Sequence, residues 1–440
     1  CSLLLYIDTF NFTAMGNINS RKAPPVVAIG ASPVYSVRRI GPRHIVLAEG
    51  GGAAATGVTN QLEVLLLSSN LNTSASNLPI RATVAQQIGT DKYSNMNMDV
   101  ACADTSDKGL YYIACGQDEY CTIYETTGFV GDKDEEKRLS FGVREVGRLT
   151  TDDSYQRCCS FDPTSRGGRL VTGGENGHVK VWNVRDLVEY RDPRLARDPL
   201  LKIEAHTANV DSVDVSPDGR YIVSVGDGTA HIWDMQFGRK VTSLTPPAGL
   251  AKGWKVRTVK FTPLGEQNMY LLAAFNQVAR TSKSQSFLVI YEFNRQAATL
   301  QPKAVQGLKI GETISTLALS QDGNLCAVGT MDGSVYVLET IDLKELHAAP
   351  NTHGIFVTGI EFLDRSSRDV LLPRELALRG SLPGPAANHR ASIVSLSADK
   401  TVQLHSVSFD SSTPLSVSML KIALWSTLLY FVFWTIMSYF

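Results

Sequence analysis

The chain has 440 residues, in which 42 lysines and arginines nearly balance 43 aspartates and glutamates. This length allows two or three average domains or one large repetitive domain, and the near-neutral charge removes the general electrostatic attraction to nucleic acid. The seven cysteines are an odd number without the C-x-x-C spacing of a zinc site, which favours a reduced chain that faces the cytosol.

The first 22 residues are predicted to be a disordered or non-native leader. The chain begins at Cys1 and its first methionine is Met15. The apolar run from Leu3 to Ile7 is too short for the hydrophobic core of a secretory signal peptide. If Met15 is the start, Met15 to Ser20 fits the N-myristoylation pattern with Gly16 as the acceptor, although short patterns of this kind often occur by chance.

The first distinctive stretch is Gly50 to Asn60, which has almost no large side chains and separates two predicted strands, Arg43 to Ala48 and Gln61 to Leu67. Three consecutive glycines give up backbone order, so they predict a main chain that takes unusual angles or approaches something closely. The stretch lacks the lysine and the following helix of a phosphate-binding loop. Its backbone carbonyls could bind a hard monovalent cation; an ordinary glycine-rich loop is the alternative.

From residue 24 onward one pattern recurs: an alternating apolar run, a turn with Asp-Gly or a similar pair, a second run, another tight turn and a third run. The clearest copy, Asn209 to Asp234, ends in Ile-Trp-Asp and follows Ala205-His206. The third runs close at residues that lie 47 to 67 positions apart, namely 65, 124, 182, 233, 291, 338 and 405.

This spacing resembles the WD-repeat period of about 40 to 45 residues, lengthened by loop insertions. Residues 23–409 are therefore predicted to form an all-β, seven-bladed WD-repeat β-propeller. Such a ring closes by pairing strands from its two ends, and Val26 to Ile29 is expected to pair with Thr401 to Leu404. The polar insertions are interpreted as solvated loops, with docking of a partner as the alternative; they are residues 131–138, 185–202 and 364–390.

No catalytic set stands out in the sequence. The phosphate-loop, zinc-protease and serine-hydrolase motifs are all missing. His206 and His231 occupy repeat positions, where a structural role is expected. The adjacent Cys158 and Cys159 are interpreted as buried strand residues, with a redox switch as the alternative.

The composition changes after a linker at residues 410–421. Residues 422–440 contain no charge, and as a helix they would be about 28 Å long, enough for a thin bilayer. We interpret them as a transmembrane anchor, with a buried apolar helix as the alternative. Lys421 would then lie at the cytosolic interface and the propeller would face the cytosol.

Four features of the sequence belong together: Pro33-Val34-Tyr35, the run from Leu47 to Asn60, degenerate WD repeats and the predicted C-terminal anchor. In combination they resemble one family, the endoplasmic reticulum exchange factors for the small GTPase that starts COPII coat assembly. The resemblance implies a guanine-nucleotide exchange factor whose first-blade loop, ordered by a potassium ion, inserts into the GTPase and releases GDP.

The resemblance also implies roles for individual residues. The inserting tip would be Gly57, Val58, Thr59 and Asn60, with Val58 as its apolar wedge. The backbone that surrounds the potassium ion would be Gly50, Gly51, Gly52, Ala53 and Ala54. Two positions depart from the family: Glu49 stands where relatives tend to have glycine, and Ala55 where animal relatives tend to have a basic residue.

Two other functions compete with exchange activity. The first is a membrane-tethered WD-repeat scaffold in which the glycine loop is incidental. The second is a DNA-binding regulator, suggested only by the name of the animal members, the prolactin regulatory element-binding proteins. The near-neutral charge and the predicted anchor argue against the second, so no nucleic acid partner is expected.

Overall fold

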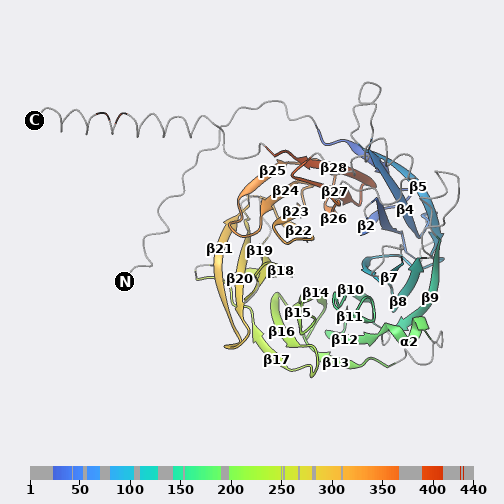
Figure 1. The fold of residues 1–440 in the computed structure, drawn as a ribbon, viewed down its shortest axis with the longest axis horizontal. Helices are drawn as coiled ribbons and strands as arrows, with labels where there is room; N and C mark the ends of the chain where they lie inside the picture. The colour runs from blue at the N-terminus through green and yellow to red at the C-terminus, as the bar shows by residue number, and fades with distance from the viewer. Residues whose placement is uncertain are drawn as a thin grey trace, which may run out of the picture.

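Seven four-stranded antiparallel sheets form a ring around a central axis (Figure 1). The computed structural model describes residues 23–41, 43–52, 57–69, 80–103, 110–126, 142–151, 154–189, 198–248, 250, 253–265, 268–279, 284–308, 311–365, 389–409, 427 and 430. The predicted all-β, seven-bladed propeller is confirmed. The predicted leader lies outside the described residues.

Six blades each consist of four consecutive strands, with the first strand nearest the axis. Blades 1 to 3 contain β2 (Val34–Ile40), β3 (His44–Glu49), β4 (Gln61–Ser69) and β5 (Ile80–Gly89); β6 (Asn97–Cys102), β7 (Tyr111–Gln117), β8 (Tyr120–Thr126) and β9 (Val143–Thr150); and β10 (Gln156–Phe161), β11 (Arg169–Gly174), β12 (His178–Asn183) and β13 (Leu201–Glu204).

Blades 4 to 6 follow the same plan. They contain β14 (Val210–Val215), β15 (Tyr221–Gly226), β16 (Thr229–Asp234) and β17 (Lys240–Ser243); β18 (Trp254–Thr262), β19 (Met269–Gln277), β20 (Ser286–Asn294) and β21 (Thr299–Gly307); and β22 (Ile314–Leu319), β23 (Leu325–Thr330), β24 (Val335–Glu339) and β25 (Glu345–Ala349). All seven predicted closing positions fall in the third strand of a blade, so the repeat boundaries are confirmed.

Blade 7 closes the ring by combining the two ends of the propeller. It contains β26 (Val357–Phe362), β27 (Ala391–Ser397) and β28 (Thr401–Val407), and its outer strand is the N-terminal β1 (Val26–Ile29). Ala28 pairs with Val402 and Ile29 with Thr401, which confirms the predicted closure.

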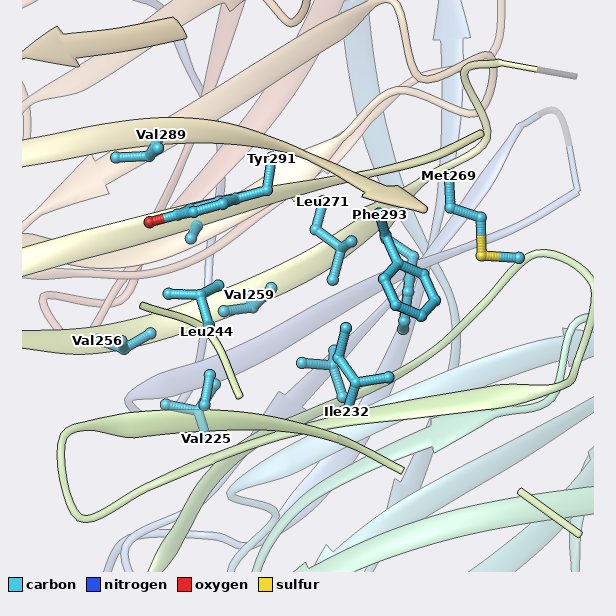
Figure 2. Close-up of a cluster of buried hydrophobic side chains, with 14 of the residues drawn as sticks. Val225, Ile232, Leu244, Val256, Val259, Met269, Leu271, Val289, Tyr291 and Phe293 are labelled. Atoms are coloured by element: carbon cyan, nitrogen blue, oxygen red, sulfur yellow. The ribbon is translucent and has the colours of Figure 1, made fainter. Parts of the chain in front are cut away.

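The apolar core lies between adjacent sheets. Side chains on the two faces of a blade alternate, so each inner strand presents apolar groups to both of its neighbours. Between blades 4 and 5, for example, Ile232, Leu271 and Phe293 are almost completely buried together (Figure 2). Burial of each such side chain stabilises the fold by about 1.5–3 kcal/mol.

One predicted solvated insertion is partly structured. After β12 the chain forms the short helix α2 (Val184–Glu189). Leu187 is buried, and its side chain occupies the space that a Cβ atom at Gly147 would fill. The interpretation of residues 185–202 as a solvated loop is therefore wrong for this part, because an apolar side chain in a polar stretch packs against blade 2. Residues 131–138 lie outside the described residues, as does most of 364–390.

The ring has two faces, which we name by what they carry. The loop face holds the turns between the second and third strands of each blade and the connections from one blade to the next. The tail face holds the turns between the third and fourth strands, and the chain leaves β28 on this face.

The predicted linker and anchor, residues 410–421 and 422–440, lie outside the described residues except for Thr427 and Tyr430. Within the part of the chain that the structure describes, no helix is both long and apolar enough to cross a membrane. The anchor therefore stays a prediction.

Candidate functional site

The glycine-rich stretch joins β3 to β4 of blade 1 on the loop face, and residues 50–52 and 57–60 of it are described. A Cβ atom at Gly50 would lie 2.6 Å from Asn60 Oδ1, and one at Gly51 would lie 2.6 Å from Val58 Cβ. Gly52 and Gly57 have φ angles of +81° and +75°. The prediction of unusual angles and close approach is therefore confirmed at these four glycines.

Asn60 braces the loop from inside. Its Oδ1 accepts hydrogen bonds from the amides of Gly51 at 2.9 Å and Gly52 at 3.1 Å. Its Nδ2 donates to the carbonyls of Gly52 at 3.2 Å and Asp91 at 3.0 Å. The side chain is buried. Asn60 was expected in the inserting tip, but the structure places its side chain at the base of the loop.

A second asparagine, which the sequence did not single out, holds the ends of the flanking strands. Nδ2 of the buried Asn95 donates to the carbonyls of Glu49 at 3.0 Å and Gln61 at 3.2 Å. Its Oδ1 accepts a hydrogen bond from Gln117 Nε2 at 2.7 Å. Because Asn95 lies in the connection from blade 1 to blade 2 and Gln117 belongs to β7 of blade 2, the loop base is fixed to the neighbouring blade.

The other predicted tip residues lie nearer the surface. Gly57 and Thr59 are exposed, and Val58 is half-buried where it packs on Gly51. Ser32, which precedes β2, donates from its hydroxyl to the Thr59 carbonyl at 2.6 Å. The described part of the loop is thus held on both sides, and its exposed end is the segment from Gly57 to Thr59.

Glu49 is buried at the end of β3, beside the segment that precedes β2. Its Oε2 accepts hydrogen bonds from the Ser32 amide at 3.3 Å and from Gln61 Nε2 at 3.1 Å, whereas Oε1 has no donor among the described residues. Burial, together with the charge of Glu63, raises the pKa of Glu49 to about 7. Glu49 therefore stands at the position where relatives tend to have glycine, but its side chain is held by Ser32 and Gln61 and does not enter the glycine loop.

The residues proposed to surround a potassium ion fit that role in part. The amides of Gly51 and Gly52 point to Asn60, so the carbonyls of the same two peptide groups, from Gly50 and Gly51, point away from it. Among the described residues, no donor contacts those two oxygens. The Gly52 carbonyl already accepts a hydrogen bond from Asn60, and Ala53 and Ala54 lie outside the described residues.

A cavity of about 580 Å³ opens on the loop face at the mouth of the central channel. Its apolar lining includes Tyr35, Met96 and Phe356, and its charged lining includes Asp211 and Lys255. Met96 follows directly on Asn95, so this mouth adjoins the base of the glycine loop. The arrangement offers a mixed surface suited to a protein partner.

The histidines at repeat positions form the internal networks of their blades. In blade 4, His206 Nε2 lies 2.9 Å from the Ser224 hydroxyl, which also accepts a hydrogen bond from Trp233 Nε1 at 2.8 Å. His231 stacks on His206. Burial lowers the pKa values of both histidines. These contacts agree with the structural role that was expected.

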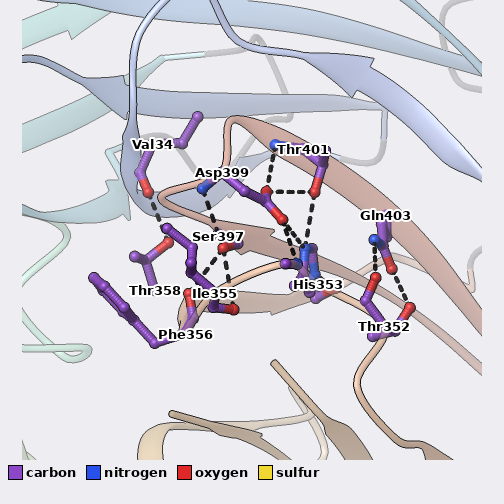
Figure 3. Close-up of polar contacts among 12 residues, drawn as sticks. Val34, Thr352, His353, Ile355, Phe356, Thr358, Ser397, Asp399, Thr401 and Gln403 are labelled. Atoms are coloured by element: carbon purple, nitrogen blue, oxygen red, sulfur yellow. Dashed lines mark hydrogen bonds and ion pairs between the residues drawn. The ribbon is translucent and has the colours of Figure 1, made fainter. Parts of the chain in front are cut away.

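Blade 7 has a related network, in which Gln403 stands at the position of His231. His353 lies between Asp399 and Thr401, with Nδ1 2.9 Å from the Thr401 hydroxyl (Figure 3). Its Nε2 is 2.7 Å from the Ser395 hydroxyl, and His405 Nε2 lies 2.8 Å from the same hydroxyl. His405 thus occupies the place that tryptophan holds in blade 4.

The paired cysteines are packed in β10. Cys158 and Cys159 are both buried and free. Burial raises the pKa of Cys158 to about 12 and that of Cys159 well above its ordinary value. Thiols in this state are poor nucleophiles, so the structure favours the buried-strand interpretation over the redox switch.

Comparisons with known proteins agree with this architecture. The family model "WD domain, G-beta repeat" matches residues 144–183, 197–234 and 307–338. The chain is similar to the guanine nucleotide-exchange factor SEC12 of Mus musculus, with 24% identity over 431 residues, which is 88% of this chain and 92% of the mouse protein. The Rattus norvegicus SEC12 gives 24% identity over 432 residues, with the same shares of both chains.

A plant protein is similar over a shorter region. SEC12-like protein 2 of Arabidopsis thaliana is 24% identical over 250 residues, which is 57% of this chain and 56% of the plant protein. The resemblance to SEC12-type, WD-repeat exchange factors that the sequence indicated is therefore confirmed.

Proposed function

We propose that this protein is a membrane-anchored guanine-nucleotide exchange factor for the small GTPase that initiates COPII coat assembly. One observation carries the proposal: a chain similar to SEC12 over most of its length presents a glycine loop that is fixed at its base, with Gly57 and Thr59 exposed on either side of the half-buried Val58. Exchange requires no bond chemistry, so the absence of a catalytic set in the sequence is compatible with it.

The loop would act as a wedge. Asn60, Asn95 and Ser32 hold its base and sides, so little conformational entropy remains to be lost when the tip meets the GTPase. Val58 would leave its packing on Gly51 only partly and insert between the switch regions, which lowers the affinity for GDP. GTP would then enter the emptied site.

A potassium ion would be held by backbone carbonyls of Gly50, Gly51, Gly52, Ala53 and Ala54. When bound, the ion would offset the mutual repulsion between carbonyl oxygens that converge on it. Asn60 supports the same segment from the other side through the amides of Gly51 and Gly52. The side chain and the ion would thus order opposite sides of the loop.

The proposed location is the endoplasmic reticulum membrane, with the propeller in the cytosol and residues 422–440 as a single transmembrane helix. The composition of this segment supports it: it has no charged residue and follows Lys421. The short span suits the thinner bilayer of the endoplasmic reticulum.

The test is GDP release from the GTPase, measured by the fluorescence of a labelled nucleotide with the full chain in vesicles. Val58→Asp should abolish the acceleration, because a carboxylate cannot enter an apolar cleft without a large desolvation cost. Val278→Asp is the matched control: Val278 is an exposed valine on the loop face, in the β19–β20 turn of blade 5. Normal exchange by Val58→Asp would overturn the proposed wedge.

A tethered scaffold without exchange activity is the second candidate. The cavity at the channel mouth favours it, since a mixed apolar and charged opening could bind peptide partners. The same assay separates the two functions: a wild-type chain that fails to accelerate GDP release at any concentration would be a scaffold. Replacing potassium with sodium in the assay tests the proposed ion separately.

A further inference from the structure

The tail face carries large apolar side chains at equivalent positions in four blades. Leu200, Phe237 and Ile341 lie in the turns between the third and fourth strands of blades 3, 4 and 6, and Phe409 follows the third strand of blade 7. Each is more than half exposed. A single exposed apolar residue is ordinary, but four of them after the third strands of blades 3, 4, 6 and 7 place several on one face of the ring, and we call these four the rim.

Cationic side chains accompany this rim. The Arg239 guanidinium lies 5.7 Å from the ring centroid of Phe237, and that of Arg365 lies 5.4 Å from the ring centroid of Phe409. Lys344 is exposed in the turn that carries Ile341. Aromatic rings covered by arginine are suited to a boundary where one side is apolar and the other carries phosphate groups.

Two acidic groups near these cations are engaged by the protein itself. Asp364, next to Arg365, forms a 3.0 Å ion pair with Arg39. Asp342 accepts a hydrogen bond from the Lys344 amide at 3.0 Å. The cations at the rim therefore have carboxylates nearby, but those carboxylates already have partners within the fold.

The chain also leaves the propeller on this face. Phe409 is the last described residue of the propeller, and residues 410–421 connect it to the uncharged segment 422–440. Twelve residues span at most about 40 Å when fully extended. If residues 422–440 cross a bilayer, the tail face is the face that the short connection holds nearest to it.

We propose that the tail face rests on the bilayer surface, with Leu200, Phe237, Ile341 and Phe409 at the level of the lipid headgroups and Arg239 and Arg365 against lipid phosphates. This inference depends on the membrane anchor in the proposed function. Its consequence is that the loop face, on the opposite side of the ring, points away from the membrane. The glycine loop is then presented to a GTPase that arrives from the cytosol.

The test measures where two matched positions lie relative to lipid. Phe237 and Val278 are both 61% exposed, the first on the tail face and the second on the loop face. In a full-length background with Cys1→Ser and Cys102→Ser, Phe237→Cys and Val278→Cys are each labelled with bimane. The protein is reconstituted into phosphatidylcholine vesicles that contain a minor share of phosphatidylserine, with and without lipids that carry a doxyl quencher near the headgroup.

The expected result is that doxyl lipid quenches the label at position 237 several-fold more strongly than the label at 278. Equal quenching at the two positions, or none at 237, would overturn the inference. A label at 237 that is shielded from aqueous iodide but not quenched by lipid would show a protein partner on this face, and would overturn it too.

Flotation of the vesicles separates this inference from the proposed function. If the chain floats with the vesicles but the label at 237 is not quenched, the proposed anchor stands and only the inferred orientation is wrong. If the chain does not float, both the anchor and the orientation are wrong. Arg239→Glu combined with Arg365→Glu should lower quenching at 237 and leave detergent-solution GDP release unchanged, because neither residue contacts the glycine loop.

Discussion

Asn60 and Gly52 form two reciprocal hydrogen bonds across the glycine loop. The Gly52 amide donates to Asn60 Oδ1 at 3.1 Å, and Asn60 Nδ2 donates to the Gly52 carbonyl at 3.2 Å. The Asn60 side chain thus gives the Gly52 backbone the two hydrogen bonds that a neighbouring strand would otherwise supply. The loop keeps a defined shape although its glycines favour disorder.

Asn60→Ala should slow accelerated GDP release at least about tenfold while the propeller remains folded. The substitution removes four hydrogen bonds, and unmade hydrogen bonds in a partly buried site cost about 1–3 kcal/mol. Most of that cost falls on the loop, because three of the four bonds join Asn60 to Gly51 and Gly52, and the fourth joins it to Asp91 after β5. Hydrogen exchange of the Gly51 and Gly52 amides measures the loss of order directly.

Asn60→Asp is the informative comparison. A carboxylate still accepts hydrogen bonds from the amides of Gly51 and Gly52 but cannot donate to the carbonyls of Gly52 and Asp91. We expect activity between that of the wild type and Asn60→Ala. Wild-type GDP release by Asn60→Ala would show that a rigid loop base is unnecessary for exchange.

Gly51→Ala should weaken the wedge without a change in the tip sequence. Its Cβ would lie 2.6 Å from both Cβ and Cγ1 of Val58, so Val58 must shift, at a cost of about 1–3 kcal/mol. We expect slower GDP release with a small change in melting temperature. Gly89→Ala, at the end of β5 in the same blade, meets nothing within 4 Å and should leave both quantities unchanged.

The repeats were predictable because their signal is local. Each blade has alternating strands, tight turns and a closing residue such as Trp233, and these features lie within one stretch of sequence. The need for Gly50 and Gly51 was predictable in the same way, from three adjacent glycines. In both cases the information was carried by neighbours in the chain.

The partners of the loop were not predictable because they come from distant positions. Asn95 and Ser32 look like ordinary connection residues, and only the closed ring places them beside residues 49–61. Asn60 was assigned to the tip because it ends the glycine run, but its amide side chain satisfies inward-facing backbone groups. Hydrogen bonds across 27 or more residues leave no periodic signal in the sequence.

Val27→Asp should destabilise the ring closure. Val27 is partly buried on β1 and packs against the core between blades 7 and 1. A charge at this position must either lose its hydration or pull β1 from β28, so we expect the unfolding free energy to fall by at least about 1 kcal/mol. Denaturant unfolding measures the change.

Val26→Asp provides the control for this prediction. Val26 lies on the same strand but is exposed, and it is absent from the apolar cluster that Val27 joins. A charge there should change the unfolding free energy by less than about 0.5 kcal/mol. Equal effects of the two variants would mean that the packing of β1 contributes little to closure.

The networks of blades 4 and 7 differ in whether their last member can take up a proton. In blade 4, Trp233 donates to Ser224, and its indole does not titrate. In blade 7, His405 contacts Ser395 and lies beside His347 and His353. Burial, together with the charges of the two neighbouring histidines, lowers the pKa of His405 to about 3; burial also lowers the pKa of His353.

Blade 7 should therefore make the whole propeller sensitive to acid. Between the ordinary histidine pKa of about 6.5 and the folded value of about 3, the unfolded chain binds a proton at His405 that the folded chain does not. The contribution of neutral His405 to the unfolding free energy is fully present above about pH 6.5. It falls as the pH decreases, by at most about 1.4 kcal/mol per pH unit for each histidine.

His405→Trp should flatten this dependence, since an indole can donate to Ser395 as Trp233 does to Ser224. The remaining slope would come from His353 and other groups. Denaturant unfolding of both proteins from pH 7 to pH 4 measures the slopes; equal slopes would exclude His405 as a source of acid sensitivity.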